Sequence, residues 1–140
     1  SYTTFEYSNA QLKSDAGTFT VTVDVKNTGK VNGKEVVQLY ASAPESALGK
    51  PVQELKAFAK TRKLKPGESQ TLSLTVTTAE LASYDEGKSA WVTDSGTYKL
   101  LVAASSRDVR ATLDAMVTDD KEVKKNDVLK PKEKIAVLKP

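Results

Sequence analysis

Alternating apolar and polar positions predict a chain built almost entirely of short strands. The clearest run is TFTVTVDVKN at residues 18–27, one face of which carries Phe19, Val21, Val23 and Val25. This alternation predicts a strand with one face in a core and the other in water. Similar runs predict six more strands, at residues 5–12, 33–43, 55–60, 70–76, 97–104 and 111–117.

Two of these runs, residues 33–43 and 97–104, are largely apolar on both faces, which is typical of central strands. In the first run Val37, Leu39 and Ala41 share one face, and Gln38 and Tyr40 share the other. Asparagine and glycine at residues 27–29 and 32–33 favour a tight turn before this run. We therefore expect residues 33–43 to form a hairpin with residues 18–27.

The strand at residues 55–60 follows a polar, proline-bearing crossover at residues 44–50. Strict alternation places Leu55, Ala57 and Ala59 on one face. The other face then carries Lys56, Phe58 and Lys60. Phe58 is therefore either a covered rim residue or a contact for something outside the domain.

The alternation breaks between residues 77 and 90. Thr78 can begin a short capped helical turn, and residues 84–88 have the composition of a loop. Trp91 follows, and the turn Asp94-Ser95-Gly96 opens the next strand. Tyr98, two residues after Gly96, is either the tyrosine corner of a β-sandwich or an ordinary core tyrosine.

Seven strands separated by turns, with almost no helix, predict an all-β fold, a β-sandwich of the immunoglobulin or fibronectin type III kind. We assign the sandwich to residues 1–118 and a charged C-terminal tail to residues 119–140. The tail is either a flexible terminus or an arm docked on this domain or a neighbour. Two small apolar clusters, residues 128–129 and 135–138, favour docking.

Length and composition limit the kinds of protein that this chain can be. A chain of 140 residues that is 39% hydrophobic and 28% charged suits one globular domain. No apolar run approaches the roughly 20 residues of a membrane helix, so we expect no membrane span. The first residues, SYTTFEYSN, have neither an initiator methionine nor a signal-peptide layout, which suggests a mature or excised segment of a longer protein.

The chain has no cysteine and no histidine. Disulfides, the usual zinc sites and catalytic triads with a histidine base are thereby excluded, and we expect neither a metal nor a cofactor. Seven lysines and five acidic residues lie at residues 119–140, which leaves the body with 14 basic and 13 acidic residues. This mixed-charge tail lacks aromatic residues and is a poor candidate for binding nucleic acid.

A set of short motifs resembles the C-terminal region of glycoside hydrolase family 3 enzymes in order and spacing. The motifs lie at residues 5–8, 25–29, 33–40, 51–58, 64–68, 84–85, 96–98 and 105–110. Together they resemble the fibronectin type III-like domain of those β-glucosidase-like enzymes. The resemblance departs from the family pattern at Lys50, Ala57 and Ala104, where an arginine and two glycines are usual.

The resemblance implies a noncatalytic accessory domain that packs on the catalytic domains of the same parent chain and stabilises them. In that family the aspartate nucleophile and the acid/base glutamate lie on two other domains. The family also suggests a periplasmic or secreted location. Retaining glycosidases need two carboxyl groups about 5 Å apart, whereas the acidic residues of this chain are scattered through turns and polar faces.

Three aromatic residues carry the remaining functional signal. Trp91, Phe58 and Tyr40 are candidates for contact with another domain or with a sugar. The alternative function is therefore a carbohydrate-binding module that anchors the enzyme on a polysaccharide. Arg107, Asp108 and Arg110 pair with one another or with a partner domain, or form a solvated turn, and the sequence does not choose among these.

Overall fold

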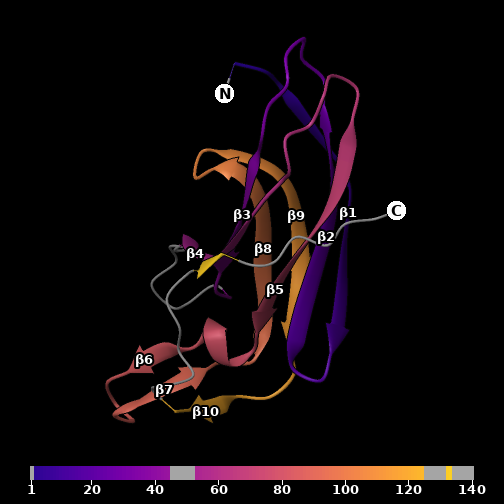
Figure 1. Cartoon of the computed structure of the whole chain (residues 1–140). Helices are drawn as coiled ribbons and strands as arrows, with labels where there is room; N and C mark the ends of the chain where they lie inside the picture. The colour runs from indigo at the N-terminus through magenta and orange to yellow at the C-terminus, as the bar shows by residue number, and fades with distance from the viewer. Residues whose placement is uncertain (1, 45–52, 125–131, 134–140) are drawn as a thin grey trace.

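The described residues form a sandwich of two large β-sheets packed face to face, with a smaller sheet at one end (Figure 1). The computed structural model describes residues 2–44, 53–124 and 132–133. The first sheet has the order β1-β2-β5 and contains β1 (Phe5–Asp15), β2 (Thr18–Asn27) and β5 (Ser69–Thr77). The second has the order β11-β4-β3-β8-β9 and contains β3 (Val36–Ser42), β4 (Gln53–Lys60), β8 (Gly96–Ser105), β9 (Asp108–Val117) and the two-residue β11 (Lys132–Glu133).

The core lies between the two sheets and is built from the faces that alternation assigns to the interior. β2 contributes Phe19 and three valines that are at most 3% exposed, and the fully buried Leu72, Leu74 and Val76 come from β5 beside it. The second sheet supplies Val37, Leu39, Leu100 and Val102, none of which is exposed. Burying a side chain of this size contributes about 1.5–3 kcal/mol, so these rows are the main source of stability.

The all-β sandwich is confirmed, and its seven long strands are those expected.

The expected hairpin between residues 18–27 and 33–43 is wrong. β2 pairs with β1 and β5, whereas β3 pairs with β4 and β8 in the other sheet. The physical reason is that each strand has a strongly apolar inner face. Placed in opposite sheets, these two faces cover each other across the core, which neighbouring strands of one sheet cannot do.

The expected alternation along β4 is also wrong at one point. Leu39 pairs with Ala57, but the next residue, Tyr40, pairs with Leu55, so Lys56 is an extra residue in a β-bulge. Paired residues point to the same side of a sheet. The bulge therefore moves Leu55 from the core face to the outer face, where Phe58 also lies.

Residues 84–88, expected to form a loop, begin inside a strand. β6 (Ser83–Asp85) and β7 (Ala90–Thr93) form an antiparallel hairpin that projects from one end of the sandwich (Figure 1). Before it lies the 3₁₀ turn η1 (Ala79–Leu81). The Thr78 hydroxyl does not cap this turn but donates to the Gly17 carbonyl at 3.2 Å, which ties the turn to the β1–β2 hairpin.

Two short strands follow β9. β10 (Lys121–Val123) pairs antiparallel with β7 and so extends the hairpin into a small third sheet, and β11 pairs in parallel with β4 at Ala57 and Phe58. The crossover at residues 45–52 and the apolar clusters at residues 128–129 and 135–138 lie outside the described residues. The division of the chain after residue 118 stays a prediction.

Candidate interdomain surface

The outer faces of the two large sheets differ in chemistry. The three-stranded sheet presents Thr20, Thr22 and Asp24 on β2 and Thr71, Ser73 and Thr75 on β5. The five-stranded sheet presents one row of Leu55, Tyr40 and Leu101 and a second row of Phe58, Gln38 and Ala103, each set by strand pairing. We call these six residues the outer strip. An antiparallel sheet whose outer face meets only water is normally polar, as the first sheet is.

The outer strip is more buried than its position predicts. Leu101 is 8% exposed and Ala103 is not exposed at all, although both lie on the outer side of β8. Tyr40 and Phe58 remain partly exposed. The Tyr40 hydroxyl donates to Gln38 Oε1 at 2.7 Å, so its polar end is satisfied within the strip.

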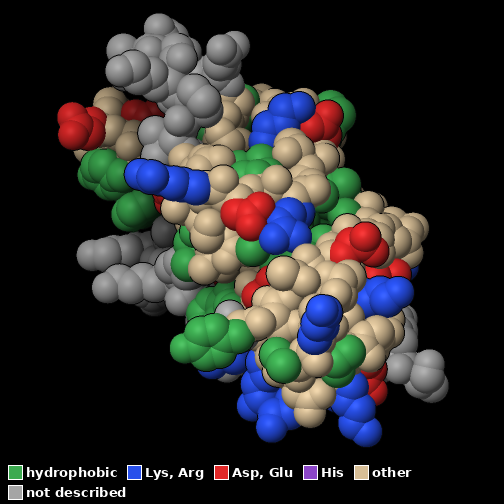
Figure 2. All heavy atoms as spheres, turned by 90° about the horizontal axis from the view of Figure 1, so that it is seen from above, with side chains coloured by type: hydrophobic (Ala, Val, Ile, Leu, Met, Phe, Trp, Pro, Cys, Tyr) green, Lys and Arg blue, Asp and Glu red, His purple; other side chains and the backbone are tan. Residues whose placement is uncertain are grey.

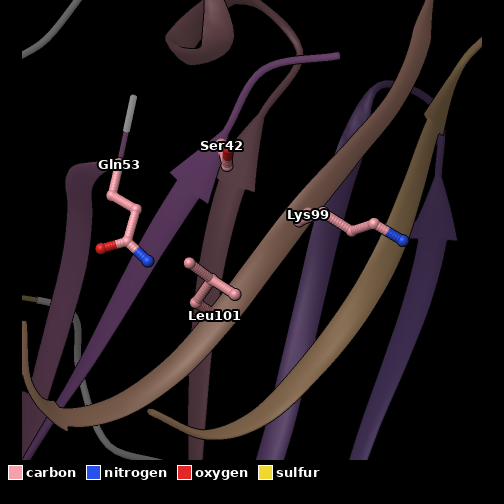
Figure 3. A pocket seen from close by; sticks show the side chains of 4 residues that line it. All are labelled: Ser42, Gln53, Lys99 and Leu101. Carbon is pink, nitrogen blue, oxygen red and sulfur yellow. The ribbon is translucent and has the colours of Figure 1, made fainter. Parts of the chain in front are cut away.

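Beside the strip lies an open hollow of about 550 Å³ (Figure 3). Ser42, Gln53, Lys99 and Leu101 line it. In the close-up Gln53 and Leu101 point toward each other, whereas Lys99 points away over β9. Lys99 Nζ lies 2.6 Å from Asp114 Oδ1 on β9, so its charge is paired outside the hollow. The hollow can thus accept a side chain without burying an unpaired cation.

Trp91 lies on the projecting hairpin rather than on the outer strip. Its ring meets that of Tyr84 edge to face, with centroids 5.6 Å apart and planes at 71°. Tyr84 is 52% exposed, which is high for a large aromatic side chain. Val123 of β10 pairs with Trp91 on the other side. The row of Tyr84, Trp91 and Val123 is a second apolar surface.

The three candidate residues therefore occupy two surfaces. Tyr40 and Phe58 lie together on the outer strip, and Trp91 lies on the hairpin. Sequence reasoning missed Leu55, because the bulge at Lys56 leaves no mark in the pattern. It also missed Leu101 as a surface residue, although a strand that is apolar on both faces is the available signal.

Tyr98 forms the tyrosine corner. Its hydroxyl donates to the Asp94 carbonyl, four residues upstream, at 2.9 Å, and the residue is 3% exposed. Burial, with a further contribution from the Asp94 carboxylate, raises the pKa of Tyr98 to about 12. The bond fixes the turn that leads into β8, the strand that carries Lys99 and Leu101.

Arg110 closes the side of the sandwich where β9 and β1 meet. Its guanidinium binds both carboxylate oxygens of Asp108, donates to the Phe5 carbonyl at 3.1 Å and lies 4.8 Å from the Tyr7 ring centroid. Tyr7 in turn donates to Glu35 at 3.0 Å. Burial first, and then Glu35, raise the pKa of Tyr7 well above its ordinary value. Arg110 thus pairs within the domain.

The carboxyl groups with shifted pKa values do not have the character of a glycosidase acid. Hydrogen bonds from backbone groups lower the pKa of Glu68 and Asp120, and the bond from Arg110 lowers that of Asp108. A general acid needs a raised pKa. Within residues 2–44 and 53–124 no group of three or more acidic side chains could hold a metal ion.

The end of the molecule that is uppermost in Figure 1 carries charges of both signs. Lys and Arg side chains there are interleaved with Asp and Glu (Figure 2).

No helix in the described part of the chain is long and apolar enough to cross a membrane.

Comparison with known proteins places the fold in a family. The model of the fibronectin type III-like domain matches residues 35–106, about half of the chain. The chain belongs to the fibronectin type III-like domain family. The match begins just before β3 and ends just after β8, so it covers β3, β4 and β8, the strands that carry the outer strip and the hollow.

Curated relatives of this domain are β-glucosidases. β-Glucosidase BoGH3A of Bacteroides ovatus is 44% identical over 117 residues, which are 81% of this chain and 16% of that protein. β-Glucosidase A of Butyrivibrio fibrisolvens is 46% identical over 105 residues, 70% of this chain and 13% of that protein. The chain thus spans about a sixth or less of the length of these relatives.

The solved structures that resemble this domain are also β-glucosidases. The domain superposes on β-glucosidase 3B of Thermotoga neapolitana, determined with α-D-glucose, with a TM-score of 0.81 and 42% identity over 88% of this chain and 17% of that one. For the β-glucosidase of Kluyveromyces marxianus with glucose, the TM-score is 0.80 and the identity 35%, over 87% of this chain and 15% of that one.

Proposed function

We propose that the chain is the noncatalytic accessory domain of a family 3 β-glucosidase and that it packs on the catalytic domains of the same parent chain and stabilises them. The observation that supports this proposal is the difference between the share of this chain and the share of each relative that the matches cover. Most of this chain matches β-glucosidases, yet it corresponds to only 16% of the first relative's length. A piece of that size is one domain of a larger enzyme.

The outer strip supports a packing role. Tyr40, Phe58 and Leu55 form an apolar, partly exposed surface beside a hollow that can receive a side chain. Aromatic residues in a desolvated centre carry most of the energy of standard interfaces. We assign the contact with the catalytic domains to this strip, and a second contact to Trp91 on the hairpin.

Several features support a noncatalytic role. The chain lacks histidine and cysteine. Asp24, Asp108 and Asp114 are engaged in bonds that hold strands or turns together. The purified chain should therefore fail to hydrolyse an aryl glucoside, and turnover above the uncatalysed rate would contradict this part of the proposal.

A binding experiment in trans tests the packing role. The catalytic part of the parent, expressed without this domain, should bind the 140-residue chain with saturable heat in titration calorimetry. Tyr40→Ser together with Phe58→Ser removes the two partly exposed rings of the strip and should weaken binding at least tenfold.

The matched control is Thr20→Ala together with Thr22→Ala, which also changes two partly exposed residues on an outer face, but on the opposite sheet. This control should bind as tightly as the parent domain. Equal affinity for the parent domain, the serine variant and the control would overturn the assignment of the strip.

The carbohydrate-binding alternative gains no support from the comparisons, because the relatives described above are hydrolases matched over a small part of their length. Trp91 and Tyr40 also lie on separate surfaces rather than in one aromatic row.

A further inference from the structure

Asn32 is the only asparagine in the sequence that is followed by a glycine. An asparagine loses its side-chain amide when the backbone nitrogen of the next residue attacks the carboxamide carbon. Glycine in the next position favours this attack, because it has no Cβ to hinder the approach and its backbone adopts many conformations. Asn32 is also exposed, so water reaches its side chain.

The backbone on both sides of Asn32 is held in place. On one side, the Val31 carbonyl accepts a hydrogen bond from Asn27 Nδ2 at 2.8 Å. On the other side, the Gly33 nitrogen donates to the Leu64 carbonyl at 3.0 Å, and the Gly33 carbonyl accepts from the Leu64 nitrogen at 2.8 Å. These two bonds form an isolated β-bridge, and Gly33 is buried within it. We call this contact the Gly33–Leu64 bridge.

The same bridge opposes the loss of the amide. The attacking atom is the Gly33 nitrogen, which must release its proton and turn toward Asn32 Cγ. In the folded chain this N–H group is buried and donates to the Leu64 carbonyl. Thr61 and Glu35 extend the pairing by two further bonds of 2.9 Å. The reaction therefore requires this segment to open, and its rate is the rate in the open state multiplied by the open fraction.

We propose that Asn32 is a site of spontaneous deamidation and that the Gly33–Leu64 bridge sets its rate in the folded chain. The Gly33 nitrogen forms a bond to Asn32 Cγ and gives a cyclic imide. The bond between Cγ and Nδ2 breaks, and Nδ2 leaves as ammonia with the proton from the Gly33 nitrogen. Water then opens the imide at either of its carbonyls and leaves aspartate or isoaspartate at position 32. This inference concerns the chain itself and does not rest on the proposed function.

The two products differ in their effect on the fold. In isoaspartate the chain runs through the former side chain, which adds a methylene to the backbone between Val31 and Gly33. The bonds from Asn27 to Val31 and from Gly33 to Leu64 then no longer fit together. Aspartate leaves the backbone path unchanged and keeps both bonds. Isoaspartate at position 32 therefore weakens the packing of the crossover between β2 and β3.

The main test measures isoaspartate at position 32 by peptide mapping after incubation at mildly alkaline pH. The full chain in guanidinium chloride, which has no bridge, gives the reference rate. The folded chain should deamidate at least about tenfold more slowly, because only its open fraction reacts. Equal rates would overturn the role of the bridge. Absence of product at Asn32 in the denatured chain would overturn the site, as would equal reaction there at Asn9, which is followed by Ala10.

A matched pair of variants tests whether the bridge itself controls the rate. Asn27→Ala removes the bonds to Val31 and Leu64 and should raise the rate in the folded chain at least about tenfold. Tyr98→Phe is the control, because it weakens the sandwich at the tyrosine corner and leaves the bridge intact. Its rate at Asn32 should be nearly unchanged. Equal acceleration in both variants would assign the reaction to global unfolding and overturn the proposal.

Two further measurements apply even if Asn27→Ala fails to fold. Thr61→Val removes the hydroxyl that accepts from the Glu35 nitrogen, and it should also raise the rate at Asn32. A folded Thr61→Val chain with an unchanged rate would contradict the proposal. The purified isoaspartate form should have a lower thermal midpoint than Asn32→Asp, and equal midpoints would contradict the bracing of the backbone around Asn32.

Discussion

The side chain of Asn27 donates a hydrogen bond to the carbonyl of Leu64, 37 residues further along the chain, at 2.9 Å. Both residues are fully buried. The same amide group donates to the Val31 carbonyl, and its oxygen accepts from the Thr3 hydroxyl and the Gly29 backbone. One asparagine thus holds together the N-terminal segment, the crossover from β2 to β3 and the segment before β5.

Asn27→Ala should lower the free energy of unfolding by about 3 kcal/mol, because it removes four hydrogen bonds and leaves buried polar groups without partners. Urea unfolding followed by tryptophan fluorescence measures this loss. Asn32→Ala is the matched control, since Asn32 is exposed, and it should stay within about 0.5 kcal/mol of the parent. Equal small losses for both variants would contradict the bracing role of Asn27.

Alanine substitutions at two glycines distinguish the stability lost to a steric clash from the stability lost to backbone strain. A Cβ on Gly29 would overlap the Thr3 side chain and lie 2.9 Å from the Thr4 backbone nitrogen. A Cβ on Gly67 would meet nothing within 4 Å, but Gly67 has φ +84°. Gly29→Ala should cost about 2–3 kcal/mol by overpacking, and Gly67→Ala about 1 kcal/mol by backbone strain. Thermal unfolding checks the order, and the reverse order would refute the close packing of the N-terminal segment on the crossover.

The tyrosine corner makes a pH-dependent prediction. Tyr98→Phe should cost about 1 kcal/mol at neutral pH, because the bond to the Asp94 carbonyl is lost. The folded-state pKa of Tyr98 is about 12, above the unfolded value near 10. The unsubstituted chain therefore keeps its full stability below pH 10, and the stability that protonated Tyr98 contributes is lost as the pH rises toward 12. The phenylalanine variant has no hydroxyl to ionise. The difference in unfolding free energy between the two chains should therefore narrow over that range, and a constant difference would contradict the assignment.

Arg110→Ala should cost about 1 kcal/mol, because it removes the bond to Phe5 and the contact with Tyr7. Arg110→Lys should recover only part of this loss, since an ammonium group cannot form the two-pronged bond with Asp108. The exposed Arg107 is the control, and Arg107→Ala should be nearly neutral. Chemical denaturation measures all three, and full recovery by lysine would show that the guanidinium geometry does not matter.

The strands of the sandwich could be predicted because a half-buried strand must alternate, as the residues of β2 do from Phe19 to Val25. The sheet to which each strand belongs could not be predicted, because alternation shows which side of a strand is apolar but not which strand pairs with it. For this reason the expected pairing of β3 with β2 was wrong. The short strands β6 and β10 contain mostly polar or charged residues, so their pairing depends on β7 rather than on any pattern of their own.

The candidate surface was partly predictable for the same reason. Tyr40 and Phe58 stood out as aromatic residues on the less apolar face of each strand, and pairing with Leu55 and Gln38 places them on one face of the sheet. Leu55 joined that face only through the bulge at Lys56, which depends on tertiary pairing. Trp91 lies on a hairpin outside the sandwich sheets, a separation that a single sequence does not encode locally.

The thermal midpoint of the parent enzyme, measured with and without this domain, tests the central claim most directly. A domain that packs on the catalytic body and stabilises it should lower the midpoint by several degrees when it is removed, because the outer strip and its partner surface then face water. An unchanged midpoint, in an enzyme that stays soluble and active without the domain, would contradict the account.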